Sequence, residues 1–367
     1  MSVQYNPGLE GVIVARTEIS HVDGKNGRLV YRGGHLIEEI ATRSYEEIIY
    51  LLWFGSFPSS EEHAAFRQRL AERRHLNEGA RGALHGLPRG VNPMDGLRTV
   101  LSAQGARPGV GRPSIDDAIS ITAVMPTIVA ACYRRAQGQP PVDPRADLGH
   151  AENLLYMLTS QEPDAARASW LQSYLVLIAE HALNPSTFTA RIVGSAGSDL
   201  WSAVVAAIGT LKGPSHGGAT PAAAEMIEAA RQAPGIATFV RDRLERGERL
   251  MGFGHREYRR YDPRAAILRD LCKTANPEYY ETAVALEETA LNELLRRHPD
   301  RPNFTNVDYF AGGVLAGVGI PADYFTCFFA VGRVAGWAAH VLEYVGQDGR
   351  IVSPASEWAG PALSPVE

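Results

Sequence analysis

The feature that most constrains the fold is a long apolar run near the C-terminus, FTCFFAVGRVAGWAAHVLEYVG, residues 325–346. It is long enough to cross a membrane, but Arg333, His340 and Glu343 interrupt it, and each would be costly in lipid. A buried helix inside a large helical body accounts better for this run. Because a buried guanidinium needs an anion, we expect Arg333 to pair with an internal carboxylate or to wait for one from a ligand.

Helical patterns dominate the rest of the chain. Ser44 and Ser59 each stand three residues before a glutamate and open an apolar or amphipathic segment, the signature of a capping box. Segments that are apolar all round, such as residues 200–211, belong in an interior or at a subunit interface. Further helices are expected at residues 115–138, 151–160, 168–183, 200–211, 220–232, 237–248, 263–275, 279–297, 306–319 and 322–343.

Strand-like alternation is confined to residues 11–34, where Asp23-Gly24 and Asn26-Gly27 offer turns between two short runs. The tail at residues 351–367 is too rich in proline to be helical. The predicted fold class is therefore mostly α, with a short N-terminal β hairpin.

The composition is that of an ordinary globular protein of 367 residues, with 36 basic and 41 acidic residues and a formal net charge of -5. This balance gives no global attraction to nucleic acid or to an anionic membrane, so we expect neither as a partner. The cysteines Cys132, Cys272 and Cys327 are far apart in apolar surroundings, which fits neither a disulfide framework nor a metal cluster. Without a secretory pattern at the N-terminus, a cytoplasmic location is expected.

A glycine-rich turn at residues 213–220, GPSHGGAT, holds His216 directly before a predicted helix. Glycine lets the backbone approach a neighbour closely or take a positive φ, and Thr220 before Pro221 is typical of an N-cap followed by the first helical residue. The free N–H groups of a helix start favour an anion or a developing oxyanion. The alternative is a histidine hydrogen-bonded to its own loop.

A second glycine-rich turn, MGFGHREYRRYDPRA at residues 251–265, places His255 before an expected helix start at Pro263. Several arginines follow the histidine. Such a cluster is either a solvated face or, around a turn that opens a helix, a place for phosphate or carboxylate. The arginines are Arg256, Arg259, Arg260 and Arg264.

Two more polar side chains stand in apolar segments. His181 is either a satisfied core histidine or part of a site, and Asp308 either stabilises a helix dipole or acts as a general base where water is scarce. The candidate residues now comprise two histidines in glycine-lined turns, an aspartate in an apolar segment and buried arginines. Such a set suits removal of a proton next to a thioester carbonyl and attack of the resulting carbanion on a dicarboxylate. No metal set is evident, and the glycine patterns match neither a Walker nor a dinucleotide motif.

Over nearly its whole length the chain resembles citrate synthases. The resemblance rests on an ordered set of motifs: ISHVDGKNGRLVYRGG, NPMDGLRTVLSAQG, HALNPSTFTARIVGSAGSDLWSAVVAAIGTLKGPSHGGA, MGFGHREYRRYDPRA, NVDYFAGGVLAGVGIP and FAVGRVAGWAAHVLE. It implies a homodimer of two-domain, mostly helical subunits. We place the small domain at residues 218–319 and the large domain at residues 1–217 plus 320–367.

The resemblance also implies roles for the reacting groups. Asp308 would take a proton from the methyl group of acetyl-CoA while His216 donates a hydrogen bond to the thioester oxygen, because so weak a carbon acid needs its enolate stabilised. His255 would polarise and protonate the oxaloacetate ketone. Citryl-CoA would then be hydrolysed to citrate and CoA.

Binding roles follow in the same way. His181, Arg264 and Arg333 match the groups that hold the substrate carboxylates, and Arg259 fits a cation near the CoA phosphates. Acetyl-CoA is expected as co-substrate, with no permanently bound cofactor and no metal. Because an enolate in open water would be reprotonated, the resemblance also implies closure of the small domain after the dicarboxylate binds first.

The chain departs from the family pattern at several positions. Family members usually end in a basic segment whose first arginine holds an oxaloacetate carboxylate in the partner's site, whereas this chain has Ser353 there and Ala355 at the second basic position. Arg350 is a candidate replacement. Thr220 stands where the family commonly has asparagine, and Glu257 lies close enough to His255 to raise its pKa or to repel a dianion.

Three functions remain open at this stage. The first is a citrate synthase with a modified carboxylate clamp. The second is a relative with another acyl or keto-acid substrate, such as a 2-methylcitrate synthase that uses propionyl-CoA. The third is a catalytically weak paralogue that binds CoA or dicarboxylates.

Overall fold

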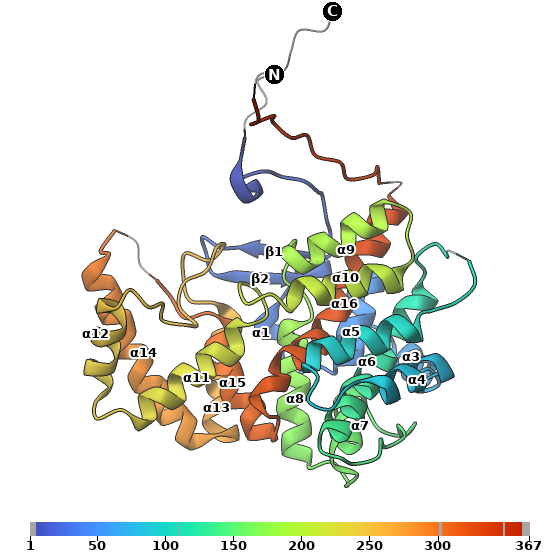
Figure 1. The fold of residues 1–367 in the computed structure, drawn as a ribbon, viewed down its shortest axis with the longest axis horizontal. Coiled ribbons are helices and arrows are strands. Elements are labelled where there is room, and N and C mark those ends of the chain that lie inside the picture. Colours follow the sequence, from blue (N-terminus) through green and yellow to red (C-terminus); the bar gives the residue numbers. More distant parts are fainter. Residues whose placement is uncertain (1–4, 110, 301–302, 348, 362–367) are drawn as a thin grey trace, which may run out of the picture.

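The computed structural model describes residues 5–109, 111–300, 303–347 and 349–361, and confirms a mostly helical fold with one small sheet (Figure 1). Short 3-10 turns occur at Pro7–Leu9, Arg32–Gly34 and Ala322–Tyr324. The α-helices are α1 (Ile37–Ile40), α2 (Tyr45–Phe54), α3 (Ser60–Ala71), α4 (Glu78–Gly86), α5 (Pro93–Gln104), α6 (Ile115–Ala136), α7 (His150–Thr159), α8 (Ala165–Ile178), α9 (Pro185–Ser195), α10 (Leu200–Leu211), α11 (Ala219–Gln232), α12 (Ile236–Glu245), α13 (Pro263–Ala275), α14 (Pro277–Arg297), α15 (Val307–Val318) and α16 (Phe325–Gly346).

The predicted N-terminal hairpin is present. Strand β1 (Ser20–Asp23) pairs antiparallel with β2 (Arg28–Tyr31), and the Asp23 carboxylate accepts a hydrogen bond from the backbone N–H of Asn26 at 3.1 Å, which closes the turn. A third strand that was not predicted, β3 (His35–Leu36), pairs with β2. The C-terminal tail contains no helix as far as residue 361, and the last six residues of the predicted non-helical segment lie outside the described residues.

Helix starts follow the capping signals, with one correction. Ser44 and Ser59 form the two predicted capping boxes. Thr220 is not an N-cap, because α11 already begins at Ala219, after Gly218. The hydroxyl that would have capped the helix is instead hydrogen-bonded to a side chain on another helix, as described below.

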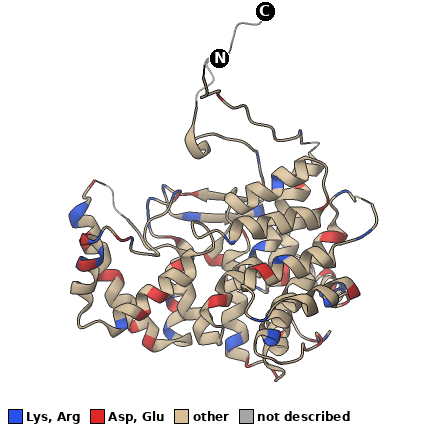
Figure 2. Cartoon of the chain, viewed as in Figure 1, with Lys and Arg blue, Asp and Glu red and all other residues tan. Residues whose placement is uncertain are grey.

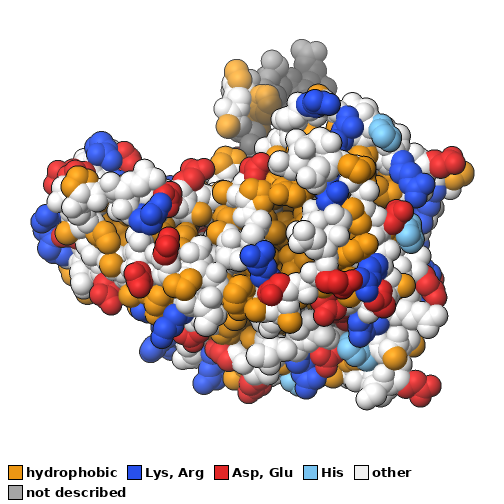
Figure 3. Space-filling model, turned by 90° about the horizontal axis from the view of Figure 1, so that it is seen from below, with side chains coloured by type: hydrophobic (Ala, Val, Ile, Leu, Met, Phe, Trp, Pro, Cys, Tyr) orange, Lys and Arg blue, Asp and Glu red, His pale blue; other side chains and the backbone are white. Residues whose placement is uncertain are grey.

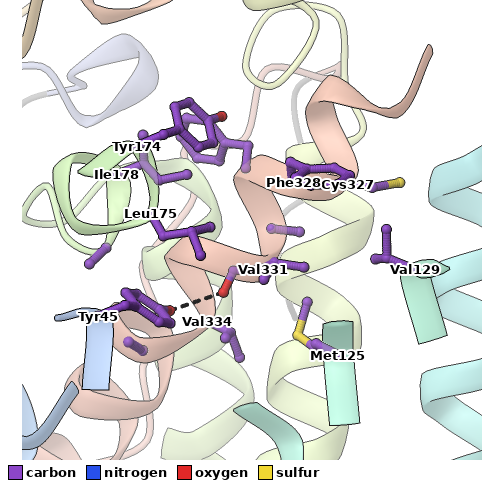
Figure 4. Close-up of a cluster of buried hydrophobic side chains, with 14 of the residues drawn as sticks. Tyr45, Met125, Val129, Tyr174, Leu175, Ile178, Cys327, Phe328, Val331 and Val334 are labelled. Carbon is purple, nitrogen blue, oxygen red and sulfur yellow. Dashed lines mark hydrogen bonds between the residues drawn. The ribbon is translucent and has the colours of Figure 1, made fainter. Parts of the chain in front are cut away.

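Helix α16 runs through the centre of the molecule and is buried over most of its length, as the apolar run predicted. Its neighbours include α8 and α6, whose side chains interleave with it, and Tyr45 on α2, whose hydroxyl donates to the carbonyl of Val331 at 3.0 Å (Figure 4). Two stretches, Ile115–Ala136 and Ala322–Gly346, are long and apolar enough to cross a membrane, but 83% and 89% of their apolar windows lie buried inside the fold. They are core helices of this body.

Helices α11 to α15 pack on one another at one side of the molecule, at the left of Figure 1. They cover nearly the same residues as the predicted small domain, 218–319. That these helices move as a unit stays a prediction. Figure 2 shows charged residues of both signs distributed over this side and over the rest of the molecule, with long uncharged stretches in the central helices.

Candidate active site

The loop that carries His255 lies beside the segment that leads into Asp308. Phe253 and Thr305 form an antiparallel bridge, and the N–H of Gly254 donates to the Phe304 carbonyl at 2.8 Å. Gly254 has φ +83°, and a side chain there would meet Asn303, so glycine is needed for both conformation and space. This pairing brings together two predicted site residues that lie far apart in the sequence.

His255 is held as a hydrogen-bond donor. Its Nδ1 accepts the backbone N–H groups of Glu257, at 2.9 Å, and Tyr258, at 3.2 Å. Burial, assisted by the positive charge of Arg264, lowers the pKa of His255 to about 4. The neutral ring therefore carries its proton on Nε2, because a nitrogen that accepts two N–H groups cannot also be protonated. The expectation that Glu257 raises this pKa is wrong, because burial and Arg264 lower it and Glu257 is not among the groups that act on it.

His181 lies against His255. The ring centroids are 5.2 Å apart, and the Tyr258 hydroxyl lies 3.2 Å from Nε2 of His181. Burial and the nearby Arg264 lower the pKa of His181 well below its usual value, so this ring is also neutral. The two alternatives for His181 do not exclude each other, because it is a buried, hydrogen-bonded histidine that also lies against His255.

Asp308 is the second residue of α15, at the helix start where the sequence placed it. Its Oδ1 accepts a hydrogen bond from the hydroxyl of Thr220 on α11, at 2.5 Å. Burial raises the pKa of Asp308, and the Thr220 hydrogen bond and the positive charge of Arg264 oppose that rise. A carboxylate of raised pKa in a low-dielectric setting is a better base than one in water.

The side chain of His216 is hydrogen-bonded to a serine rather than to its own loop. Its Nε2 lies 2.8 Å from Ser186 Oγ, which also receives the indole N–H of Trp337 at 3.1 Å. The serine proton is then directed either to Asn184, also 2.8 Å away, or to His216. In the second arrangement the neutral ring carries its hydrogen on Nδ1. Burial lowers the pKa of His216 to about 4.

The glycines beside His216 allow neighbouring backbone to pack closely against this turn. A side chain at Gly217 would meet the Leu211 carbonyl at 2.3 Å, and one at Gly218 would meet Pro214 at 2.8 Å. Neither glycine has a positive φ of the kind that favours this residue. The Gly217 carbonyl also accepts the hydroxyl of Thr326, at 2.9 Å, which fixes the turn to α16.

Arg264 is buried and paired with Asp262. Two hydrogen bonds, Nε to Oδ1 at 3.0 Å and Nη2 to Oδ2 at 2.8 Å, form a bidentate pair. Asp262 also caps α13 and accepts the N–H of Val307 at 3.2 Å, so it ties the start of α13 to the start of α15. The remaining nitrogen of Arg264, Nη1, makes no hydrogen bond to the described residues.

Arg333 makes its hydrogen bond to a backbone carbonyl and not to a carboxylate. Among the described residues no carboxylate forms an ion pair with it, and its Nε donates to the Ile178 carbonyl at 2.5 Å. The guanidinium lies 4.7 Å from the centre of the Phe329 ring, which is in turn 6.4 Å from the ring of His216. Burial lowers the pKa of Arg333 to about 10. The negative charge of Glu180 opposes this fall, although the two side chains form no ion pair among the described residues, so the guanidinium can still take an anionic ligand.

Arg259 lies at the edge of this group, beside the hairpin. Its backbone N–H donates to the Gly24 carbonyl at 2.8 Å, and its guanidinium donates to the Arg256 carbonyl at 3.0 Å. With Lys25 and Arg260 it lines an open cavity of about 660 Å³.

Ser353 and Arg350 lie in the exposed C-terminal tail, and the contacts described above do not include them.

Residues that the sequence did not single out hold the predicted ones in place. These residues are Ser186, Tyr258, Asp262 and Trp337. Asp262 was detectable, because it directly precedes Pro263 at an expected helix start. For the other residues no local pattern indicates the partner, since each contact joins distant parts of the chain.

Comparisons with known proteins show the family of this chain. The family model described as citrate synthase, C-terminal domain, matches residues 8–355. This chain belongs to the citrate synthase family. The citrate synthase of Haloferax volcanii is 39% identical, over 98% of this chain and 97% of the relative. A 2-methylcitrate synthase of Mycobacterium tuberculosis is 36% identical, over 96% of this chain and 90% of the relative.

Solved structures give the same result. Citrate synthase from Thermotoga maritima aligns with a TM-score of 0.87 at 35% identity, covering 99% of this chain and 98% of that one. Citrate synthase from Thermoplasma acidophilum, in a ternary complex with carboxymethyl coenzyme A and oxaloacetate, aligns with a TM-score of 0.92 at 29% identity, covering 100% of this chain and 98% of that one. The expected family, fold and enzyme class are confirmed, and the chain is an acyltransferase of the citrate synthase type.

Proposed function

We propose that the chain condenses acetyl-CoA with oxaloacetate and hydrolyses the resulting citryl-CoA to citrate and free CoA. The observation that supports this most is the joining of three chemically suited groups from three segments. Asp308 is linked through Thr220 to the turn of His216, and through the Phe253–Thr305 bridge to the loop of His255. No permanently bound cofactor and no metal take part in this scheme.

In the first step Asp308 removes a proton from the acetyl methyl group. The neutral ring of His216 donates a hydrogen bond from Nδ1 to the thioester oxygen, with Ser186 giving its own proton to Nε2. Because burial lowers the pKa of His216 to about 4, the ring is already neutral and donates its N–H to the developing enolate oxygen without carrying a charge. The enolate carbon then attacks the oxaloacetate ketone, and Nε2–H of His255 protonates the new alkoxide.

Arg333 and Nη1 of Arg264 are the groups we assign to the oxaloacetate carboxylates, with His181 beside them. Arg333 has no carboxylate partner among the described residues, and Arg264 keeps one nitrogen free of Asp262. For the CoA phosphates we assign the cavity beside the hairpin. Its cations are Lys25, Arg259 and Arg260, and the guanidinium of Arg259 donates to the His255 carbonyl at 3.3 Å.

We also assign a homodimer and a cytoplasmic location. The terminal segments carry large exposed apolar side chains: Ile13 is 89% exposed, and Ile351 and Trp358 are each 66% exposed. Both segments extend away from the helical body at the same end (Figure 1), and hydrophobic side chains also gather over the middle of one face (Figure 3). Exposed apolar surface of this kind favours contact with a second copy. Light scattering of the purified protein at several concentrations tests the dimer.

The acyl substrate is tested by release of free thiol in the presence of oxaloacetate. We expect a higher kcat/KM with acetyl-CoA than with propionyl-CoA. The 2-methylcitrate synthase among the relatives supports the second candidate, and the opposite ratio would establish it. Binding of oxaloacetate without thiol release from either acyl-CoA would leave only a catalytically weak paralogue.

A further inference from the structure

The side chain of Thr220 takes an unusual partner. A threonine in a helix commonly donates its hydroxyl proton to the carbonyl one turn before it. Here the proton goes across to α15, where Thr220 Oγ1 lies 2.5 Å from Oδ1 of Asp308. Thr220 is buried, with 2% of its surface exposed, so water does not compete for this proton. Because a hydroxyl has one proton, this hydrogen bond is the single one it can donate.

The two oxygens of Asp308 are therefore not equivalent. Within the described part of the chain, Thr220 is the one residue whose side chain donates to this carboxylate, and Oδ2 receives no hydrogen bond. We propose that Thr220 is a positioning residue that holds Oδ1 and leaves Oδ2 as the oxygen that takes the substrate proton. This inference rests on the proposed function of Asp308 as the base.

Threonine suits this role by its shape. Its branched side chain restricts rotation about the first side-chain bond, so the hydroxyl keeps its direction when no substrate is bound. Thr220 also lies four residues after His216, in the same turn and helix start. The hydrogen bond to Asp308 thus fixes the base relative to the segment that presents the thioester donor.

The effect of Thr220 on the pKa of Asp308 supports the same role. Burial raises the pKa of Asp308, and the hydrogen bond from Thr220 is the largest influence that lowers it. Without the hydroxyl, the positive charges of Arg264 and Arg333 still lower the pKa of Asp308, but the carboxylate loses its direct hydrogen-bond donor. A larger fraction of Asp308 would then be protonated, and inactive as a base, on the acid side of neutrality.

The test compares Thr220→Val with the wild-type enzyme. Valine keeps the branched shape and removes the hydroxyl, so we expect kcat to fall at least about tenfold with KM for oxaloacetate within about threefold of wild type. The acid limb of the kcat/KM profile should move to higher pH. Thr220→Ser retains the donor but not the branch, so it should restore most of the rate and return the profile to that of the wild type.

The matched control is Thr122→Val. Thr122 is as fully buried, and its hydroxyl has no hydrogen-bond partner among the described residues, so this variant makes the same chemical change away from the site. It should leave kcat and the pH profile unchanged.

Two outcomes would overturn the inference. One is an active Thr220→Val enzyme with the wild-type pH profile. The other is a loss of kcat that Thr220→Ser does not restore or that leaves the acid limb in place, which would indicate a packing role. Failure of the wild-type protein to release thiol would instead overturn the proposed function.

Discussion

Glu180 Oε1 and His340 Nε2 lie 2.9 Å apart, and neither side chain reaches solvent. Arg191 can only donate, so His340 must accept its hydrogen bond on Nδ1, at 3.0 Å, and carry its own proton on Nε2. Ser20 donates to the same carboxylate oxygen at 2.9 Å. Since Glu180 directly precedes His181, this network anchors the turn that brings His181 to the site.

Removal of one member should be costly. His340→Ala leaves the buried Glu180 carboxylate with the Ser20 hydroxyl as its one remaining donor among the described residues, and we expect the free energy of unfolding to fall by about 3 to 5 kcal/mol. The double variant with Glu180→Gln should be destabilised by less than the sum of the single variants, because they share one interaction. Denaturant unfolding measures all three variants, and purely additive losses would exclude the coupling.

The missing clamp arginine gives a prediction for substrate binding. Ser353→Arg restores a guanidinium at the position where family members usually have one. If the clamp was lost at a cost to affinity, this variant should lower the KM for oxaloacetate by about tenfold, the effect of one charge-assisted contact. An unchanged or higher KM would indicate that the pocket has been rebuilt for a different keto acid. Ser356→Arg, in the same exposed tail, is the control.

Binding should be ordered. In the proposed function oxaloacetate would neutralise the buried charge of Arg333, and we expect this to favour closure of residues 218–319 over the large domain before acyl-CoA reacts. Calorimetry should therefore find tighter binding of an unreactive acetyl-CoA analogue when oxaloacetate is present. Equal affinity with and without oxaloacetate would contradict the order.

The neutral His255 should make stability depend on pH. In the unfolded chain its pKa returns to about 6.5, whereas burial and Arg264 hold it at about 4 in the native protein. Between these values the unfolded state binds more protons. The contribution of His255 to the free energy of unfolding is therefore full above about pH 6.5 and is lost as the pH falls toward 4. His255→Asn cannot titrate and should show a shallower decline in unfolding free energy over this range. Parallel curves for the two proteins would refute this.

Much of the architecture could be predicted from local patterns. Capping boxes, the apolar run of α16 and the turns at Asp23 and Asn26 act through neighbours within a few residues, and they gave the helices and the hairpin. The starts of α5 and α9, with asparagine caps before proline, carry the same signals and were overlooked. Thr220 was placed wrongly because its tertiary partner outweighed its local preference for an N-cap.

The candidate site was less accessible from the sequence. The residue types and the family resemblance identified His216, His255 and Asp308, but not their hydrogen-bond states. Those states depend on Ser186, Thr220 and the N–H groups beside His255, and the first two contacts span 30 and 88 residues. Local patterns carry no information about contacts of this length.

The central claim is that the Asp308 carboxylate removes the proton from the acetyl group. Asp308→Asn preserves the shape and the hydrogen bond from Thr220 but removes the base. The direct measurement is thiol release from acetyl-CoA with oxaloacetate, paired with calorimetry of oxaloacetate binding. We predict that release falls at least about 100-fold while the Kd for oxaloacetate stays within about threefold; release near the wild-type rate would contradict the account.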